Sequence, residues 1–142
     1  MSTTRWAQEL LAIDSPGKGF IDITARVAAC VARSEIRMGQ CVVFVRHTSA
    51  SLVIQENADP AVLRDLERWL FELAPEHRAW EHADEGPDDM PAHARSVLTK
   101  TSETIPIMAG RLALGTWQAL YLWEHRHRPH RREVLVQLSG AG

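Results

Sequence analysis

Two histidines enclose the stretch of this chain that is richest in metal-binding side chains. His82 and His93 flank a run of acidic residues that includes Asp88 and Asp89. Zn²⁺ and other divalent first-row ions accept imidazole nitrogens and carboxylate oxygens as ligands. The eleven-residue step between the histidines does not match the spacing of a closed structural zinc site. The segment therefore predicts a divalent metal site, and the alternative interpretation is that its carboxylates simply stabilise the start of a helix.

A second polar cluster begins at His47, directly after an apolar run over residues 41–45. The ends of rigid strands often carry the side chains of binding and catalytic sites, so His47 is a candidate site residue. A solvated turn is the alternative interpretation. Asn57 lies in a polar stretch further along, just before Asp59 and Pro60, a pair typical of a helix start with Asp59 as the N-cap.

Residues 124–132 form a basic segment with four arginines and three histidines. Arginine binds phosphate through paired hydrogen bonds, which makes Arg132 a candidate phosphate ligand. The alternative is a basic hairpin turn that pairs with surface acids. Glu124 ends the apolar run 119–123, and a carboxylate at that boundary needs a cationic partner: a metal ion, Arg132 or a protonated histidine.

Hydrophobic periodicity and turn residues indicate the elements that must position these side chains. We expect strands over residues 5–13, 20–23, 41–45, 104–107, 118–124 and 133–138. The continuous apolar run 41–45 predicts a strand covered on both faces. Two main helices are expected, from residue 24 to about 38 and from residue 60 to Pro75, with a short helix over residues 91–98. Because strands and helices do not alternate regularly, this order predicts an α+β fold with antiparallel sheets.

Composition restricts the function classes. The 142 residues have room for a single domain over residues 1–142. Sixteen basic and eighteen acidic residues give a net charge of −2, so no basic field attracts nucleic acid or an anionic membrane. The longest uncharged run, residues 112–123, is too short to span a membrane. Neither nucleic acid nor a membrane is therefore expected as a partner.

Two cysteines, Cys30 and Cys41, lie in apolar surroundings and form no Cys-x-x-Cys motif. This pattern predicts buried thiols in a reducing compartment, and hence a cytoplasmic location. The chain also lacks the glycine patterns of dinucleotide-binding folds and P-loops.

Several ordered motifs give the chain a resemblance to the YjbQ-like family, also called the secondary thiamine-phosphate synthase family. They lie at residues 47–52, 56–59, 88–93, 102–110 and 115–120. The resemblance covers residues 24–140. It implies a sandwich of two mostly antiparallel sheets that assembles as a homotrimer, with a metal-binding pocket built from His47, Asn57, His82, His93 and Glu124. One departure is Asp89, where the family commonly has Asn, so an amide donor is replaced by an acceptor-only carboxylate.

These observations together predict a metal-dependent enzyme that acts on a small phosphorylated substrate, and the resemblance implies thiamine-phosphate synthase activity. The expected metal ligands are His47, His82 and His93, with zinc as the leading ion. The expected catalytic residues are His47, Asn57 and Glu124. His47 is either ligand or proton acceptor, and Glu124 is either a fourth ligand or a residue that orients the ligands. Substrate contacts are expected from Asn57, Asp88, Asp89, Gln118 and Arg132. The alternatives are a trimeric protein that binds metal or phosphate without catalysis, and a metal-assisted hydrolase.

Overall fold

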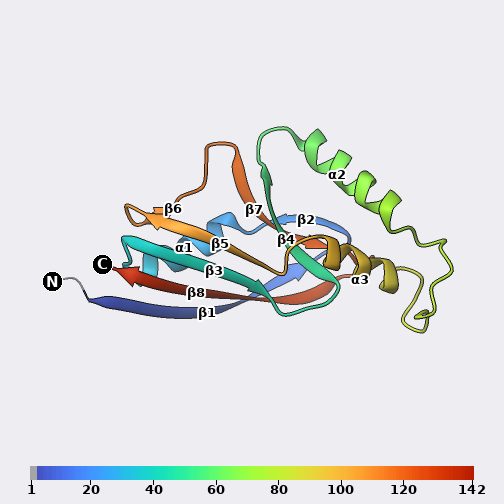
Figure 1. Ribbon diagram of the computed structural model, residues 1–142, viewed down its shortest axis with the longest axis horizontal. Helices are drawn as coiled ribbons and strands as arrows, with labels where there is room; N and C mark the ends of the chain where they lie inside the picture. The colour runs from blue at the N-terminus through green and yellow to red at the C-terminus, as the bar shows by residue number, and fades with distance from the viewer. Residues whose placement is uncertain (1–2) are drawn as a thin grey trace.

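The computed structural model describes residues 3–142, and residues 1 and 2 of the predicted domain lie outside the described residues. The strands are β1 (Thr4–Ser15), β2 (Gly19–Asp22), β3 (Met38–Val45), β4 (Ala50–Glu56), β5 (Ser102–Met108), β6 (Arg111–Leu112), β7 (Gln118–Glu124) and β8 (His130–Ala141). They form a five-stranded sheet in the order β1-β8-β3-β5-β6 and a three-stranded sheet in the order β2-β7-β4 (Figure 1). All of these strand pairs are antiparallel. The expected α+β class with antiparallel sheets is confirmed.

The chain passes from the small sheet to the large one at residues 125–129. Strand β7 is central in the small sheet, and β8 pairs with both β1 and β3 in the large sheet. Glu124, the last residue of β7, is therefore brought close to Arg132, near the start of β8. This crossing point positions most of the polar side chains discussed below.

Three α-helices occur in residues 3–142: α1 (Thr24–Ser34), α2 (Pro60–Leu73) and α3 (Asp89–Leu98). Helix α2 begins as predicted, because the Asp59 carboxylate accepts a hydrogen bond of 2.9 Å from the backbone N–H of Ala61. It projects from one end of the sheets (Figure 1), and only Leu70 of its residues is buried. No helix in the described part of the chain is both long and apolar enough to cross a membrane.

Both sheets and α1 contribute to one hydrophobic core. Val43 and Val136 come from the large sheet, Leu52 and Leu122 from the small sheet and Val27 from α1, and each is fully buried. Burying these aliphatic side chains contributes roughly 1.5–3 kcal/mol each to folding. The core thus holds the two sheets face to face and fixes the ends of β3, β4 and β7, near which the candidate site lies.

Two expectations about the elements were wrong, and two strands were not predicted. Helix α1 ends at Ser34, because Glu35 takes a left-handed conformation (φ 59°) that turns Ile36 into the core. Strand β3 is buried on one face only, since Phe44 is 42% exposed while Val43 and Val45 are buried. Strand β4 was not predicted, because its first residues belong to the polar cluster that follows His47. The two-residue strand β6 was also missed.

The uncharged segment 112–123 is divided between an exposed stretch and the interior of the fold. Its second half forms most of β7, where Leu120, Leu122 and Trp123 are at most 3% exposed. Trp117 is 64% exposed, and Trp6 and Trp69 are also exposed. Trp6, Trp69 and Trp117 are thus exposed and Trp80 is partly exposed, so these four residues remain available for self-association.

Candidate metal centre

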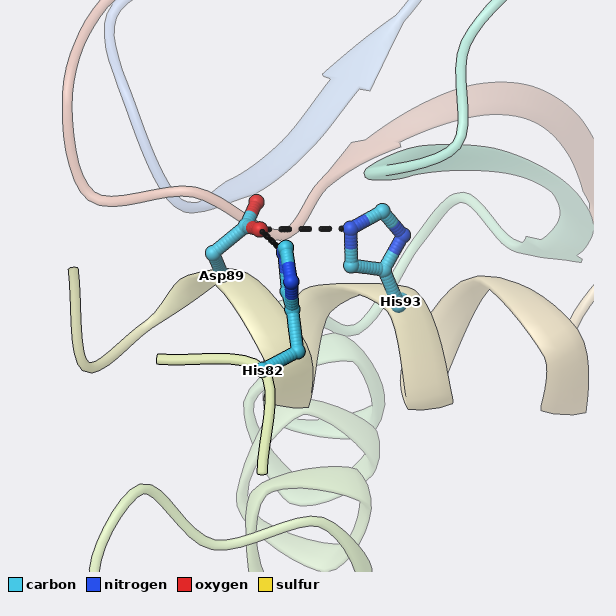
Figure 2. A group of neighbouring side chains, drawn as sticks. All are labelled: His82, Asp89 and His93. Carbon is cyan, nitrogen blue, oxygen red and sulfur yellow. Dashed lines mark hydrogen bonds and ion pairs between the residues drawn. The ribbon is translucent and has the colours of Figure 1, made fainter. Parts of the chain in front are cut away.

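Three side chains converge where the loop after α2 meets α3: His82, Asp89 and His93 (Figure 2). Asp89 Oδ2 lies 2.8 Å from His82 Nε2 and 3.2 Å from His93 Nε2. An ionised carboxylate can only accept, so each imidazole donates its Nε2–H to this one oxygen. Ligand atoms of the three residues lie within 4.8 Å of one another. We call this group the His–Asp–His cluster.

Local structure explains the convergence. Asp89 and His93 are four residues apart on α3 and therefore share one face of the helix. The preceding loop turns at Gly86, whose φ of 103° is one that L-residues rarely adopt. The Gly86 carbonyl then accepts a hydrogen bond from the backbone N–H of Asp89. In this way the loop returns His82 to the helix start.

Arg126, in the crossing segment between the sheets, holds both acidic residues of the helix start. Its Nη1 donates to Asp89 Oδ1 at 2.8 Å, and its Nε donates to Asp88 Oδ2 at 3.0 Å. Its Nη2 donates to the Glu85 carbonyl at 2.8 Å. Burial opposes ionisation of Asp88, but Arg126 and the backbone N–H of His127 hold its pKa below the usual range. Arg126 of the basic segment thus pairs with acids, as in the alternative interpretation of its sequence, but these acids are buried and do not lie on the surface.

The His–Asp–His cluster has the donor set of a divalent transition-metal site. Two imidazoles and one carboxylate suit zinc and related ions. Because Arg126 occupies Asp89 Oδ1, only Oδ2 is directed at the imidazoles. The carboxylate is 7% exposed, whereas the side chains of His82 and His93 are 50% and 32% exposed. The residues present therefore fit a metal ion that solvent and small molecules can reach.

His47, expected as the third ligand, is engaged elsewhere, and Asp89 takes that place in the cluster. The His47 Nε2 accepts a hydrogen bond of 2.7 Å from the backbone N–H of Glu133. Burial, and secondarily the charge of Arg132, lower the pKa of His47, which keeps the ring neutral. In a neutral ring whose Nε2 accepts, Nδ1 carries the proton, so neither nitrogen has a lone pair free for a metal.

Glu124 and Arg132, expected to act in catalysis and phosphate binding, form a buried ion pair instead. Glu124 is 0% and Arg132 4% exposed. Arg132 Nε donates to Glu124 Oε1 at 2.8 Å, and Arg132 Nη2 donates to both Glu124 Oε2 and Ser49 Oγ. The structure thus supplies the cationic partner that Glu124 needs. Neither side chain is open to a substrate in this structure.

Asn57 and Gln118, also expected to contact substrate, lie at the opposite end of the small sheet. Glu56 pairs with Gln118, whereas Ala50 pairs with Glu124, so six residues, roughly 20 Å of strand, separate the two ends. The Asn57 side chain donates to the carbonyls of Thr116 and Gln118, and Gln118 Oε1 accepts from the backbone N–H of Gly115. Within one chain these two residues fasten the 113–117 loop.

Two buried polar side chains near the site were not singled out from the sequence. His125 is fully buried, its Nε2 lies 2.8 Å from Ser51 Oγ, and burial lowers its pKa to about 3. Arg95 of α3 is 1% exposed and donates to the Ala74 carbonyl at 3.0 Å, which joins α3 to the end of α2. The pairing of Arg126 could have been predicted from the sequence, because segments 81–89 and 124–132 carry opposite charges. No sequence pattern pointed to the burial of Arg95.

Comparison with known proteins identifies the family. Residues 9–141 match the model for UPF0047 proteins, YjbQ-like. A UPF0047 protein of Synechocystis is 57% identical over 140 residues, covering 98% of this chain and 95% of the relative. The UPF0047 protein YjbQ of Escherichia coli O157:H7 is 36% identical over 136 residues, covering 95% and 99% of the two chains.

Two solved structures are similar to this one. A crystal structure of a YbjQ-like protein of unknown function from Sulfolobus solfataricus has a TM-score of 0.90 at 24% identity, covering 97% of this chain and 99% of the other, which shows the shared fold. A conserved hypothetical protein from Thermus thermophilus has a TM-score of 0.80 at 39% identity, covering 90% and 97%. From the family model and these relatives together, the chain belongs to the UPF0047, or YjbQ-like, family.

Proposed function

We propose that this protein is a metal-dependent enzyme that acts on a small phosphorylated molecule. The observation that carries the proposal is the His–Asp–His cluster, which offers three donor atoms within 4.8 Å of one another. Structural zinc sites are closed by four protein ligands, whereas catalytic sites use three and keep a position open. The number of donors therefore favours a centre that binds a reactant.

The chain's own residues prepare this centre. Asp89 would bind the ion through Oδ2 while Arg126 holds its other oxygen, and His82 and His93 would bind it through Nε2. A bound divalent ion supplies a Lewis acid that neutralises charge developing on phosphate oxygens. Both imidazoles must then give up their Nε2 protons, so metal binding competes with protons and weakens as the pH falls.

The substrate class is proposed from the family resemblance. Thiamine-phosphate synthesis joins a pyrimidine diphosphate to a thiazole phosphate and releases diphosphate, so it requires a group that binds the leaving phosphates. Arg132 is buried against Glu124 and is not available for that role. We keep phosphate-ester hydrolysis as the second candidate, because a three-ligand centre leaves room for a bound water.

Metal analysis and turnover of matched variants test the proposal. Protein prepared without chelator should contain about one divalent ion per chain, zinc being the leading candidate, and His93→Ala and Asp89→Asn should lose it. His77→Ala is the control, since His77 is exposed and outside the cluster. Activity should be assayed with the pyrimidine and thiazole pair and with a panel of phosphate esters. Metal retention without any turnover would favour a binding protein over an enzyme.

Self-association is a separate proposal, and we infer that the protein forms a homotrimer, as the family resemblance implies. The cytoplasmic location is proposed from the two cysteines, which form no disulfide. Helix α2 supports self-association, because Trp69 is 57% and Leu73 53% exposed on an amphipathic helix with one fully buried residue. The outer face of the large sheet also exposes Trp6 and Leu10. Apolar surface of this kind is commonly covered by a partner.

A further inference from the structure

Two hollows flank the His–Asp–His cluster, and each takes one of its histidines as part of its wall. The His93 hollow, of about 510 Å³, is bounded by the end of β3, the segment after it and α3. The His82 hollow, of about 490 Å³, is bounded by the loop after α2 and the start of α3. A reactant of the metal centre can approach through either hollow. The side chains that line each hollow therefore decide which one receives the reactant.

The His82 hollow is acidic. It is lined by Glu81 and Asp84 together with Trp80 and Met90, and none of its five described lining residues is Lys or Arg. A phosphate dianion placed there would meet two like charges, and the lining itself offers no Lys or Arg to offset them. This hollow therefore disfavours an anionic reactant.

The His93 hollow has the opposite character. Its polar lining residues are Arg46, His47, His93 and three residues with hydroxyl groups, and none of its described lining residues is Asp or Glu. The hydroxyl groups belong to Thr48, Ser96 and Thr101. Guanidinium and hydroxyl groups are the usual partners of phosphate oxygens.

Arg46 is available to an incoming anion. Its Nη1 lies 2.7 Å from a Glu133 carboxylate oxygen, but the two side chains are 53% and 45% exposed. An ion pair in solvent is weak, and a guanidinium has five N–H donors, so a phosphate can share it or replace Glu133. Phe44, 42% exposed, and Val97, 83% exposed, add apolar surface at the same hollow.

We propose that the His93 hollow is the phosphate subsite of the enzyme, with Arg46 as the anchoring cation and with Phe44 and Val97 contacting the organic part of the ester. This inference rests on the proposed function for its link to the metal. It assigns Arg46, rather than the buried Arg132, to the phosphate group. It also predicts a preference for phosphate esters with an apolar or aromatic substituent over inorganic phosphate.

Calorimetric titration with inorganic phosphate and with phenyl phosphate tests the subsite, using metal-loaded and metal-free protein. Arg46→Gln should weaken phosphate binding at least 10-fold. Val97→Glu should do the same by placing a carboxylate in the hollow, and at an exposed helix position this change should not disturb folding. Arg111→Gln, the same change at an exposed strand position in the large sheet outside the hollow, is the control and should bind as the wild type does.

The outcomes separate this inference from the proposed function. Loss of phosphate binding in Arg46→Gln and Val97→Glu, but not in Arg111→Gln, supports the subsite even if the wild type binds no metal, a result that refutes only the metal centre. Equal phosphate affinities in the wild type and both hollow variants overturn the subsite. Undetectable phosphate binding by the wild type in both metal states also overturns it, as does phenyl phosphate binding more weakly than inorganic phosphate.

Discussion

Removing the charge of Glu124 should lower the free energy of unfolding. We expect this loss of stability, and not a direct effect on catalysis, to be its main consequence. Glu124→Gln keeps the size of the side chain but leaves the Arg132 guanidinium, 4% exposed, without a counter-ion. Breaking a buried pair by removing one partner costs about 3–5 kcal/mol of folding free energy. For a chain of this length that corresponds to a decrease in Tm of about 10–20 °C.

Thermal unfolding followed by circular dichroism measures this change, and two comparisons make it specific. Glu133→Gln removes a carboxylate of the same charge from the exposed pair with Arg46, which should cost about 0–1 kcal/mol. The double variant Glu124→Leu with Arg132→Met removes both charges and should recover much of the lost stability, because no unpaired ion remains.

The pH dependence provides a second check on the same pair. Burial alone would raise the pKa of Glu124, but the hydrogen bonds from Arg132 and from the Arg126 backbone N–H hold it below its usual value. The pair therefore stabilises the protein at neutral pH, and this contribution is lost as the pH falls below the usual carboxyl range through the lowered pKa. An unchanged Tm in Glu124→Gln, together with lost turnover, would refute a structural role and place Glu124 in the reaction.

Three further predictions concern other parts of the molecule. Arg126→Lys keeps the charge but loses the geometry that orients Asp89, so metal affinity should fall about 10–100-fold, while Arg128→Lys should leave it unchanged in the same titration. Burial lowers the pKa of His125 to about 3, and unfolding exposes the ring so that it can bind a proton. The free energy of unfolding should therefore fall by about 2 kcal/mol between pH 6.5 and pH 5. The free energy of unfolding measured in urea should show this decrease in the wild type and a smaller decrease in His125→Asn. Light scattering should give about 48 kDa for a trimer of 16.0 kDa chains, and a mass near one chain at micromolar concentration would contradict it.

Local sequence patterns determined the elements that were predicted well. The expected strand over residues 118–124 coincides with β7, and the Asp59-Pro60 pair correctly marked the start of α2. Alternating apolar residues, N-caps and proline act within a few residues, so the sequence displays them directly. Strand β4 was missed because Ala50 and Ser51 are small residues whose burial is created by pairing with β7.

The site was predictable in its residue types but not in its geometry. His82, Asp89 and His93 were all chosen from the sequence, because imidazoles and carboxylates in one short segment are unusual. The position of the Asp89 carboxylate between the two imidazoles depends on Arg126, which lies 37 residues further along the chain. Likewise, the backbone N–H of Glu133, 86 residues away, could not be predicted from the sequence as the partner of His47.

The position of β8 in the large sheet has a consequence for biosynthesis. This strand is the last of the fold to leave the ribosome, yet it lies between β1 and β3 and pairs with β1 along twelve residues, from Thr4–Ala141 to Ser15–His130. Until β8 emerges, β1 and β3 have no neighbour on that side, and their apolar residues and backbone groups stay accessible to other chains. The large sheet therefore closes only after translation reaches the final strand, and pairing across nearly the whole chain makes that closure slow.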